Sequence, residues 1–359
     1  MDRIATTNSE FLSQRPQYSQ DTEELRAYID AAVDWEATHG LLFRAPAADA
    51  VAGAEWLQSA LVPAPIALAP SPIPRREFEK VVALQPVLNQ LFDRIARDHG
   101  FLVSTLRSLG TADEFTSRVF DMYLKQQALG VAKPAVVGIH RSDYLIHAPE
   151  NEPDAKPQAK QVEFNTIAAS FASLSAIVGD FHRDDQEIAV AYYRSGYAPT
   201  DFPTDQEWNG RWLIEQSRAI AVPSLAYHLA GCKKIQQVLA QPGVVERFIS
   251  DPAMAQQVRE CFVGLYPLDS SEDGQRALEL AVSDPSNYVV KPQREGGGYN
   301  SYGDDIPRLL NSISDEERQG YILMDLIRAP GFNSMLLRNG KLIPADVVSE
   351  LGIYGIWVR

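Results

Sequence analysis

The sequence predicts an α+β protein in which a helical N-terminal region precedes a part made of short strands and helices. Up to about residue 130, apolar residues recur at helical spacing, whereas after residue 134 they gather in short runs typical of strands. In addition, Asn339-Gly340 lies between two apolar runs, which is a strong signal for a hairpin. We therefore expect mixed or antiparallel sheets, packed with helices.

Amphipathic helices are expected along the first 134 residues. Their apolar faces are Leu25, Ile29, Ala32 and Val33 in one segment, and Leu88, Leu91, Phe92 and Ile95 in another. Gly40 and Gly100 follow these segments as expected ends. A third helix begins with a capping box of Thr111 and Glu114 and ends at Gly130.

The proline-rich stretch between the first two helices, residues 63–74, has two interpretations. It is either a linker or an extended segment held against the core through Ile66, Leu68 and Ile73.

Short apolar runs predict the strands of the second part. The candidates are Ala135–Ile139, Gln161–Asn165, Glu187–Tyr193, Tyr288–Lys291, Tyr321–Ile327 and Asp346–Glu350, with Met335–Arg338 and Lys341–Ile343 as the hairpin. Helical patterns lie between them near residues 206–219, 226–241, 252–264 and 273–282. The polar stretch Ala148–Lys160 predicts an exposed loop.

Composition excludes several classes of protein. The 359 residues contain 33 Lys and Arg against 47 Asp and Glu, a formal charge of −14. An acidic chain is a poor partner for nucleic acid or an anionic membrane. The two cysteines, Cys232 and Cys261, have no metal-ligand spacing, and we expect both to be ordinary buried residues. No secretory signal or membrane-spanning run is visible, so we expect a cytoplasmic protein.

The sharpest chemical feature is the segment from Lys291 to Gly303. Lys291 ends a predicted strand, and Glu295 precedes three consecutive glycines. Glycines let backbone N–H groups approach a phosphate, a lysine supplies positive charge, and a carboxylate supplies a hard oxygen for Mg²⁺. The pattern fits neither a Walker A loop nor a Rossmann fingerprint. A plain surface turn is the alternative, but the flanking charges favour a phosphate site.

A second feature is Glu163 and Asn165, which share one face of a predicted strand. An acid and an amide on one face can coordinate a hard cation together, although a solvent-exposed face has the same alternation. Glu295 favours the metal interpretation because it supplies a further carboxylate. Lys233 and Lys234 follow a helical pattern and point about 100° apart, so at most one of them faces a given cleft.

Two arginines lie close to predicted strands. Arg141 and Arg194 can clamp a carboxylate with their planar forks, and Tyr197 adds a hydroxyl group. Local salt bridges or caps are the alternative for these turns. The scattered histidines form no pattern of a covalent hydrolase or a zinc protease.

Together these stretches resemble eukaryotic-type glutathione synthetase, a family of ATP-grasp ligases. The motifs that carry the resemblance, in the order of the family, are 64–74, Arg141–Tyr144, Glu163–Ile167 with Ser170-Phe171, Tyr193–Tyr197, Leu229–Gln237, Lys291–Tyr302, Tyr321–Met324 and Ser349–Gly352. The resemblance implies an ATP-grasp-like fold and an ATP-dependent carboxylate–amine ligase. It also implies a cytoplasmic homodimer that acts on γ-glutamylcysteine and glycine.

The resemblance also implies a role for each matching position. Mg²⁺ ligands are matched by Glu163, Asn165 and Glu295, and the lysines on the ATP phosphates by Lys233 and Lys291. The loop over the triphosphate is matched by Gly296, Gly297, Asn300 and Tyr302, and the adenosine pocket by Met324, Ile327 and Glu350. Contacts to γ-glutamylcysteine are matched by Arg141, Ser170, Arg194 and Tyr197, with Arg141 also as the catalytic residue. Ala168 replaces a serine of the family, which removes one substrate hydrogen bond.

The resemblance divides the chain into four parts: a helical region (1–134), a strand-rich magnesium and substrate segment (135–205), a helical lid-like segment (206–290) and the ATP loop with nucleotide-binding strands (291–359). The family has roughly a hundred more residues between the Glu163 strand and the Arg194 strand, which carry most of its substrate domain. It also continues beyond Arg359 with a strand and a glycine- and alanine-rich loop. The alternative to an active ligase is therefore a shortened form that binds ATP or dimerises without turnover.

Overall fold

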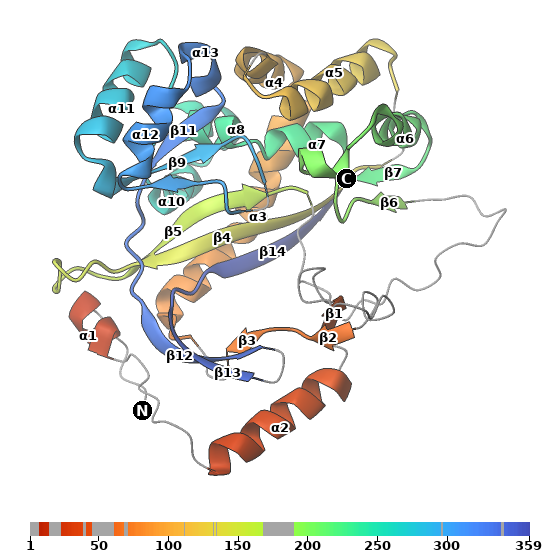
Figure 1. The fold of residues 1–359 in the computed structure, drawn as a ribbon. Helices are drawn as coiled ribbons and strands as arrows, with labels where there is room; N and C mark the ends of the chain where they lie inside the picture. The colour runs from red at the N-terminus through yellow and green to blue at the C-terminus, as the bar shows by residue number, and fades with distance from the viewer. Residues whose placement is uncertain are drawn as a thin grey trace.

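The computed structural model describes residues 7–13, 23–38, 41–44, 61–67, 71–110, 112–131, 133, 135–167, 190–295, 297–338 and 341–359. Within these ranges the fold is α+β, as predicted, and consists of separate small sheets with helices packed around them (Figure 1).

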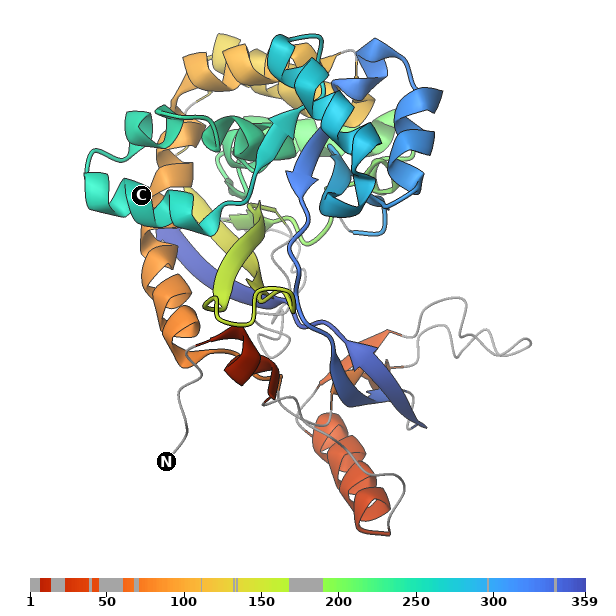
Figure 2. The ribbon, with the colours of Figure 1, turned by 90° about the vertical axis from the view of Figure 1, so that its left-hand side faces the viewer.

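A central sheet of three antiparallel strands crosses the molecule in the order β14 (Leu351–Val358), β4 (Val137–His147) and β5 (Gln158–Asn165). The long helix α3 (Arg75–Arg97) runs along one face of this sheet (Figure 2). Its fully buried stripe contains Val81, Leu91 and Ile95, and burial of such a stripe is what stabilises an amphipathic helix on a sheet. Phe92 of α3 stacks on Phe164 of β5 with ring centroids 3.8 Å apart. This packing leaves the side chains of Glu163 and Asn165, next to Phe164, on the face away from α3.

A second sheet of four antiparallel strands has the order β10 (Ser301–Tyr302), β9 (Tyr288–Pro292), β11 (Tyr321–Asp325) and β8 (Leu265–Pro267). Helices α11 (Glu272–Ser283) and α12 (Asp305–Ser312) pack on it, with α13 (Asp315–Arg318) nearby. Its core joins residues of these strands and helices, namely Leu268, Ala277, Ala281, Val290, Ile306, Leu310 and Leu323. In Figure 1 this sheet lies beside the β5 edge of the central sheet.

The remaining helices gather at the same end of the molecule. They are α4 (His99–Leu106), α5 (Glu114–Ala128), α6 (Asp205–Gln216), α7 (Leu225–Ala230), α8 (Lys233–Leu239), α9 (Val244–Phe248) and α10 (Pro252–Cys261). Their buried faces join the core of the central sheet. A parallel pair, β6 (Val190–Tyr192) and β7 (Ile220–Val222), lies beside them. Because α8 begins at Lys233, directly after the buried helix α7, this lysine is held close to both larger sheets.

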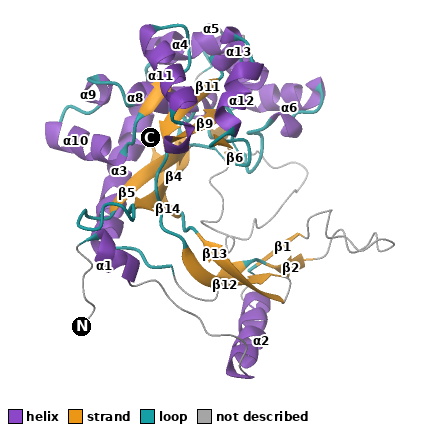
Figure 3. Ribbon diagram, turned by 60° about the vertical axis from the view of Figure 1, so that its left-hand side comes forward, coloured by secondary structure: helices purple, strands orange, loops and turns teal. Residues whose placement is uncertain are grey.

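At the other end lies a third antiparallel sheet of β13 (Lys341–Val347), β12 (Phe332–Arg338) and β3 (Ile66–Ala67) (Figure 3). The pair β1 (Leu42–Arg44) and β2 (Leu61–Pro63) and the helices α1 (Asn8–Ser13) and α2 (Glu23–Thr38) complete the described elements. Within the described part of the proline-rich stretch, Ile66 and Ala67 pair with Leu337 and Leu336, which supports the extended segment over the linker.

The hairpin predicted at Asn339-Gly340 is confirmed by the pairing of Arg338 with Lys341, although the two turn residues lie outside the described ranges. The strand predicted at Asp346–Glu350 is wrong for its last three residues, since only Asp346 and Val347 lie in a strand, at the end of β13. The hairpin register continues to Phe332 and Val347, so residues 348–350 connect it to β14.

Further local predictions need correction. Of the predicted capping box, Thr111 lies outside the described residues, and α5 is capped instead by Asp113, which accepts a hydrogen bond from the Thr116 amide. Gly100 lies inside α4, since Asp98 both ends α3 and caps α4. The single helical pattern near 226–241 is two helices, α7 and α8. Gly40, Leu68 and residues 187–189 lie outside the described residues.

Candidate functional site

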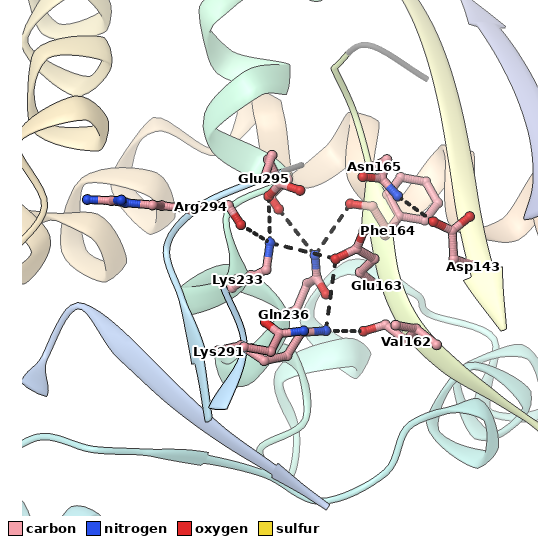
Figure 4. A network of polar contacts seen from close by, with 12 residues as sticks. Asp143, Val162, Glu163, Phe164, Asn165, Lys233, Gln236, Lys291, Arg294 and Glu295 are labelled. Atoms are coloured by element: carbon pink, nitrogen blue, oxygen red, sulfur yellow. Dashed lines mark hydrogen bonds and ion pairs between the residues drawn. The ribbon is translucent and has the colours of Figure 1, made fainter. Parts of the chain in front are cut away.

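Two buried lysines and two carboxylates meet where the central sheet faces the second sheet (Figure 4). Glu163 comes from β5, Lys233 from the first position of α8, and Lys291 and Glu295 from β9 and the loop behind it. The Lys233 ammonium donates to Glu295 Oε1 at 2.9 Å and to the Arg294 carbonyl oxygen at 2.8 Å. It also lies 3.6 Å from Glu163 Oε2. One ammonium group therefore contacts two carboxylates from different parts of the chain.

Lys291 reaches the same cluster from the second sheet. Its Nζ donates to the Val162 carbonyl oxygen at 3.0 Å and lies 3.9 Å from Glu163 Oε2. The Lys291 side chain is only 5% exposed and that of Lys233 only 4%. A lysine held this deep needs a negative partner. Carboxylates of the cluster supply this partner and hold both lysines in place.

Burial and charge shift the titration of these groups in opposite directions. Burial lowers the pKa of Lys291, and Glu163 only partly opposes this. Burial also acts to lower the pKa of Lys233, but Glu295 and Glu163 outweigh it and raise the pKa of this lysine. For Glu163, burial acts to raise the pKa, whereas Lys233 and Lys291 lower it overall. Burial raises the pKa of Glu295, since Lys233 only partly compensates it.

Next to this cluster, Asp143 of β4 binds two predicted site residues. Its carboxylate accepts two hydrogen bonds of 2.7 Å from the Arg141 guanidinium and one of 2.9 Å from Asn165 Nδ2. Glu350 also lies beside Asp143; burial together with the Asp143 and Glu163 carboxylates raises the pKa of Glu350 to about 7. Arg141 thus forms a bidentate salt bridge with Asp143 of its own strand. A local salt bridge was the alternative that the sequence left open for this arginine.

The predicted adenosine residues Met324 and Ile327 share a small apolar cluster with Val289. Met324 Sδ lies 3.9 Å from Lys291 Nζ, so this cluster adjoins the charged one. Glu350 lies instead with Asp143, as described above.

The loop behind β9 returns as β10. Gly297 has a positive φ of 68°, and Asn300 Nδ2 donates to the Tyr302 hydroxyl at 3.4 Å. Tyr302 is 52% exposed and pairs with Val289.

The predicted dipeptide residues Arg194 and Tyr197 lie in a loop after β6. Asp201 Oδ2 accepts hydrogen bonds from the backbone N–H groups of Gly196, Tyr197 and Ala198 at 2.9, 3.1 and 3.1 Å. These bonds fix the loop, in which Gly196 has φ 92°. Arg194 is exposed, whereas Tyr197 lines a cavity that also borders Asn165, Lys233 and Glu295. Ser170 and Gly296 lie outside the described residues.

The structure therefore brings together Glu163, Lys233, Lys291 and Glu295, with Asn165, Arg141 and Glu350 around Asp143. Sequence reasoning missed Asp143, Asp201 and three polar residues of the cavity, namely Thr166, His228 and Gln293. The only sequence signal for Asp201 is its spacing from Gly196, since a short acid often bonds nearby backbone N–H groups.

The side-chain oxygen atoms of the cluster are of the type that binds Mg²⁺. Mg²⁺ prefers oxygen ligands and is usually held by one or two carboxylates together with substrate phosphates. The Lys233 ammonium contacts both Glu163 and Glu295, so the space between these carboxylates stabilises a positive charge. Over the described ranges, no three His, Cys, Asp or Glu side chains gather into a metal group. Two carboxylates and the Asn165 amide fit a cation that substrate phosphates help to hold.

Comparison with known proteins gives a consistent result. The model of the ATP-binding domain of eukaryotic glutathione synthase matches residues 22–359. Glutathione synthetase of Xenopus laevis is 32% identical, and the match covers 82% of each chain. The Homo sapiens enzyme is 32% identical over 95% of this chain and 90% of its own length. The chloroplastic glutathione synthetase of Arabidopsis thaliana is 31% identical over 94% of this chain and 79% of its own.

These alignments extend over 391 to 443 positions, more than the 359 residues of this chain allow without gaps. The aligned lengths are therefore consistent with the predicted internal shortening. Among solved structures, a glutathione synthetase-like effector from Globodera pallida in its apo form has a similar fold, with a TM-score of 0.68 at 19% identity over 95% of this chain and 92% of that one. None of the helices that the structure describes is long and apolar enough to cross a membrane.

Proposed function

The chain belongs to the eukaryotic glutathione synthetase family, whose members are ATP-dependent ligases, and we propose that it joins γ-glutamylcysteine to glycine to form glutathione. The observation that carries this proposal is the cluster in which Lys233 and Lys291 meet Glu163 and Glu295. Buried cations beside hard oxygen ligands are what an enzyme needs to hold a triphosphate.

The proposed reaction has two steps, a phosphoryl transfer and the displacement of phosphate. A carboxylate oxygen of γ-glutamylcysteine attacks the γ-phosphorus of ATP, the bond from phosphorus to the bridging oxygen breaks, and ADP leaves. The glycine nitrogen then attacks the acyl carbon, phosphate leaves with the electrons of its C–O bond, and the nitrogen loses a proton. In this proposal Lys233 and Lys291 neutralise the phosphate charge. Bound Mg²⁺ would supply further positive charge on the phosphates, held by Glu163, Asn165 and Glu295.

The other expected roles follow the same geometry. The apolar cluster with Met324 and Ile327 adjoins Lys291, which supports an adenosine pocket there, with Glu350 as its polar member. The loop of Gly296, Gly297, Asn300 and Tyr302 would cover the triphosphate. Arg141, Ser170, Arg194 and Tyr197 would hold γ-glutamylcysteine. Support for Tyr197 comes from its place in the cavity beside Lys233.

The coarser organisation is part of the same proposal. Residues 135–205 would hold the metal and the dipeptide, 206–290 would form a helical lid-like part, and 291–359 would hold the nucleotide on the body formed with 1–134. We propose a cytoplasmic homodimer, as the family resemblance implies.

The test is a ligase assay on the full chain with ATP, Mg²⁺, γ-glutamylcysteine and glycine. Glutathione is measured by mass spectrometry and phosphate by a coupled assay, and each substrate is omitted in turn. We expect product only in the complete mixture. Retained ATP binding without glutathione would overturn the proposal.

A paired variant tests the phosphate site itself. Lys291→Met should weaken ATP binding in calorimetry by at least about tenfold, since one charge-assisted contact contributes roughly 1.5–3 kcal/mol. Lys234→Met is the matched control, because Lys234 pairs with Asp269 instead of the cluster. Equal ATP affinity in Lys291→Met and the control would refute the assignment.

A further inference from the structure

Three buried polar atoms without a partner line one cavity beside Lys233. They are Thr166 Oγ1, His228 Nδ1 and Gln293 Nε2, and in the described parts of the chain none of them has a hydrogen-bond partner. Their residues are 2%, 7% and 6% exposed. An unsatisfied buried polar atom costs roughly 1–3 kcal/mol, so three in one cavity indicate a place that receives a polar group.

The walls of the cavity come from three separate elements. Thr166 follows β5, His228 lies in α7, and Gln293 follows β9. The packing is close around Thr166, since a Cβ on Gly231 would lie 2.2 Å from its Oγ1. A side chain at position 231 would therefore collide with the Thr166 side chain. The cavity also borders Lys233 and Glu295, so it opens onto the charged cluster.

The orientation of the side chains defines the chemistry of the occupant. Gln293 Oε1 accepts a hydrogen bond of 3.1 Å from the Lys234 backbone N–H, which turns the Gln293 NH₂ group toward the cavity as a donor. Thr166 can donate its hydroxyl proton. Burial lowers the pKa of His228 to about 3, so its ring is neutral and Nδ1 can also carry a proton.

A group that accepts hydrogen bonds matches this set, whereas an ammonium group would place its own protons against the Gln293 donor. The cavity borders both the Lys233 ammonium and the Glu295 carboxylate, so the three donors, and not the local charge, define the occupant. An oxygen of a carboxylate can accept hydrogen bonds from these donors. The cavity volume of about 20 Å³ has room for one small group of this kind or for one water molecule.

We propose that Thr166, His228 and Gln293 form a subsite for one carboxylate oxygen of a ligand whose other end lies at Lys233. Resting on the proposed function, the ligand is the acyl donor, and the subsite orients the carboxylate that receives the phosphoryl group. Such donors would continue to bind this oxygen while charge redistributes in the reaction.

The experiment observes the His228 ring by NMR in the full chain labelled with ¹⁵N-histidine. The chain has six histidines, and His228→Asn identifies the signal of interest by its loss. The probes are acetate, methylammonium and γ-glutamylcysteine, added separately. We expect the His228 signals to move saturably with acetate and with γ-glutamylcysteine, and to stay unchanged with methylammonium.

Isosteric variants then test the donors. Thr166→Val and Gln293→Met should each weaken the acetate response by about five- to tenfold, as expected for one hydrogen bond. Thr105→Val, a half-buried threonine of α4 outside the cavity, is the matched control and should leave the response unchanged. Thermal unfolding of each variant shows that the chain is folded.

The outcomes separate this inference from the proposed function. If acetate shifts the His228 signals but γ-glutamylcysteine does not bind, the carboxylate subsite stands and γ-glutamylcysteine is excluded as its ligand. If glutathione forms but no carboxylate probe shifts the His228 signals, the proposed function stands and the subsite is overturned. The cavity would then hold a water molecule. A response to methylammonium alone would also overturn it.

Discussion

Replacing Lys233 by methionine removes the one ammonium group that contacts both carboxylates of the cluster. Its Nζ lies 2.9 Å from Glu295 Oε1 and 3.6 Å from Glu163 Oε2. At an effective dielectric constant of about 20, Coulomb's law gives about 6 kcal/mol for the nearer contact and about 5 kcal/mol for the farther one. Desolvation opposes these gains, and removal of one partner from a buried ion pair costs about 3–5 kcal/mol. We expect a loss of stability in this range.

The assay is a double-mutant cycle of Lys233→Met and Glu295→Gln, measured by urea unfolding with tryptophan fluorescence. In the single variant Lys233→Met, Glu163 and Glu295 repel each other more strongly, because of the two lysines only Lys291 remains, 3.9 Å from Glu163 Oε2. The double variant contains one charge fewer, so we expect it to regain about 2 kcal/mol relative to the sum of the single changes. Lys234→Met is the control and should change stability by less than about 1 kcal/mol, because its ion pair is partly exposed.

A divalent cation provides the second readout. Millimolar Mg²⁺ should raise the unfolding temperature of Lys233→Met more than that of the parent chain, because Glu163 and Glu295 have lost the ammonium group between them. The same Mg²⁺ should have little effect on the double variant with Glu295→Gln. Additive changes to within about 0.5 kcal/mol, together with an equal response to Mg²⁺, would refute the coupling of the cluster.

Two further predictions concern the surroundings of the cluster. Asp201→Ala removes the acceptor of three backbone N–H groups, so the KM for γ-glutamylcysteine should rise about tenfold while the KM for ATP stays unchanged. Asp201→Asn keeps an acceptor oxygen and should restore part of the loss. An equal rise in both KM values would contradict a role of Asp201 through Tyr197. Glu350 has a pKa raised to about 7, so the folded state binds its proton more tightly than the unfolded state, and this contribution to stability is lost as pH rises from about 4.5 to 7. Glu350→Gln should therefore gain stability relative to the parent chain from pH 5 to pH 8 in buffer with a chelator, and parallel pH profiles of thermal unfolding would exclude the shift.

Local sequence patterns were enough to identify the charged residues of the cluster. The alternation at Glu163 and Asn165 and the glycines after Glu295 are visible within a few residues, and both lie where a strand and a strand-end loop were expected. Lys233 was harder to place, since its neighbour Lys234 has the same pattern. Only the tertiary structure distinguishes them, with Lys233 4% and Lys234 13% exposed and pointing to different carboxylates.

The strand β14 was missed for a physical reason. Its glycines weaken the strand pattern, yet they are required by contacts from distant residues. A Cβ on Gly355 would lie 2.4 Å from the Asn89 amide of α3, and one on Gly352 would lie 3.1 Å from Arg141 Cδ. Likewise Thr166, His228 and Gln293 are ordinary polar residues far apart in sequence. Their missing partners become visible only when three elements enclose one cavity.

The proposed chemistry is compatible with the short connection that the family resemblance implies after β5, because the ends of the described chain on either side are anchored independently. Ile167 and Tyr197 border the same cavity although they flank residues 168–189. On one side, β5 pairs with β4 up to Asn165. On the other, Asp201 binds the Tyr197 loop, and the buried Arg211 guanidinium lies 3.7 Å from the Tyr193 ring. None of these contacts involves the connecting residues, so the longer segment that the family resemblance implies can be inserted there while the carboxylates, the lysines and the tyrosine keep their places.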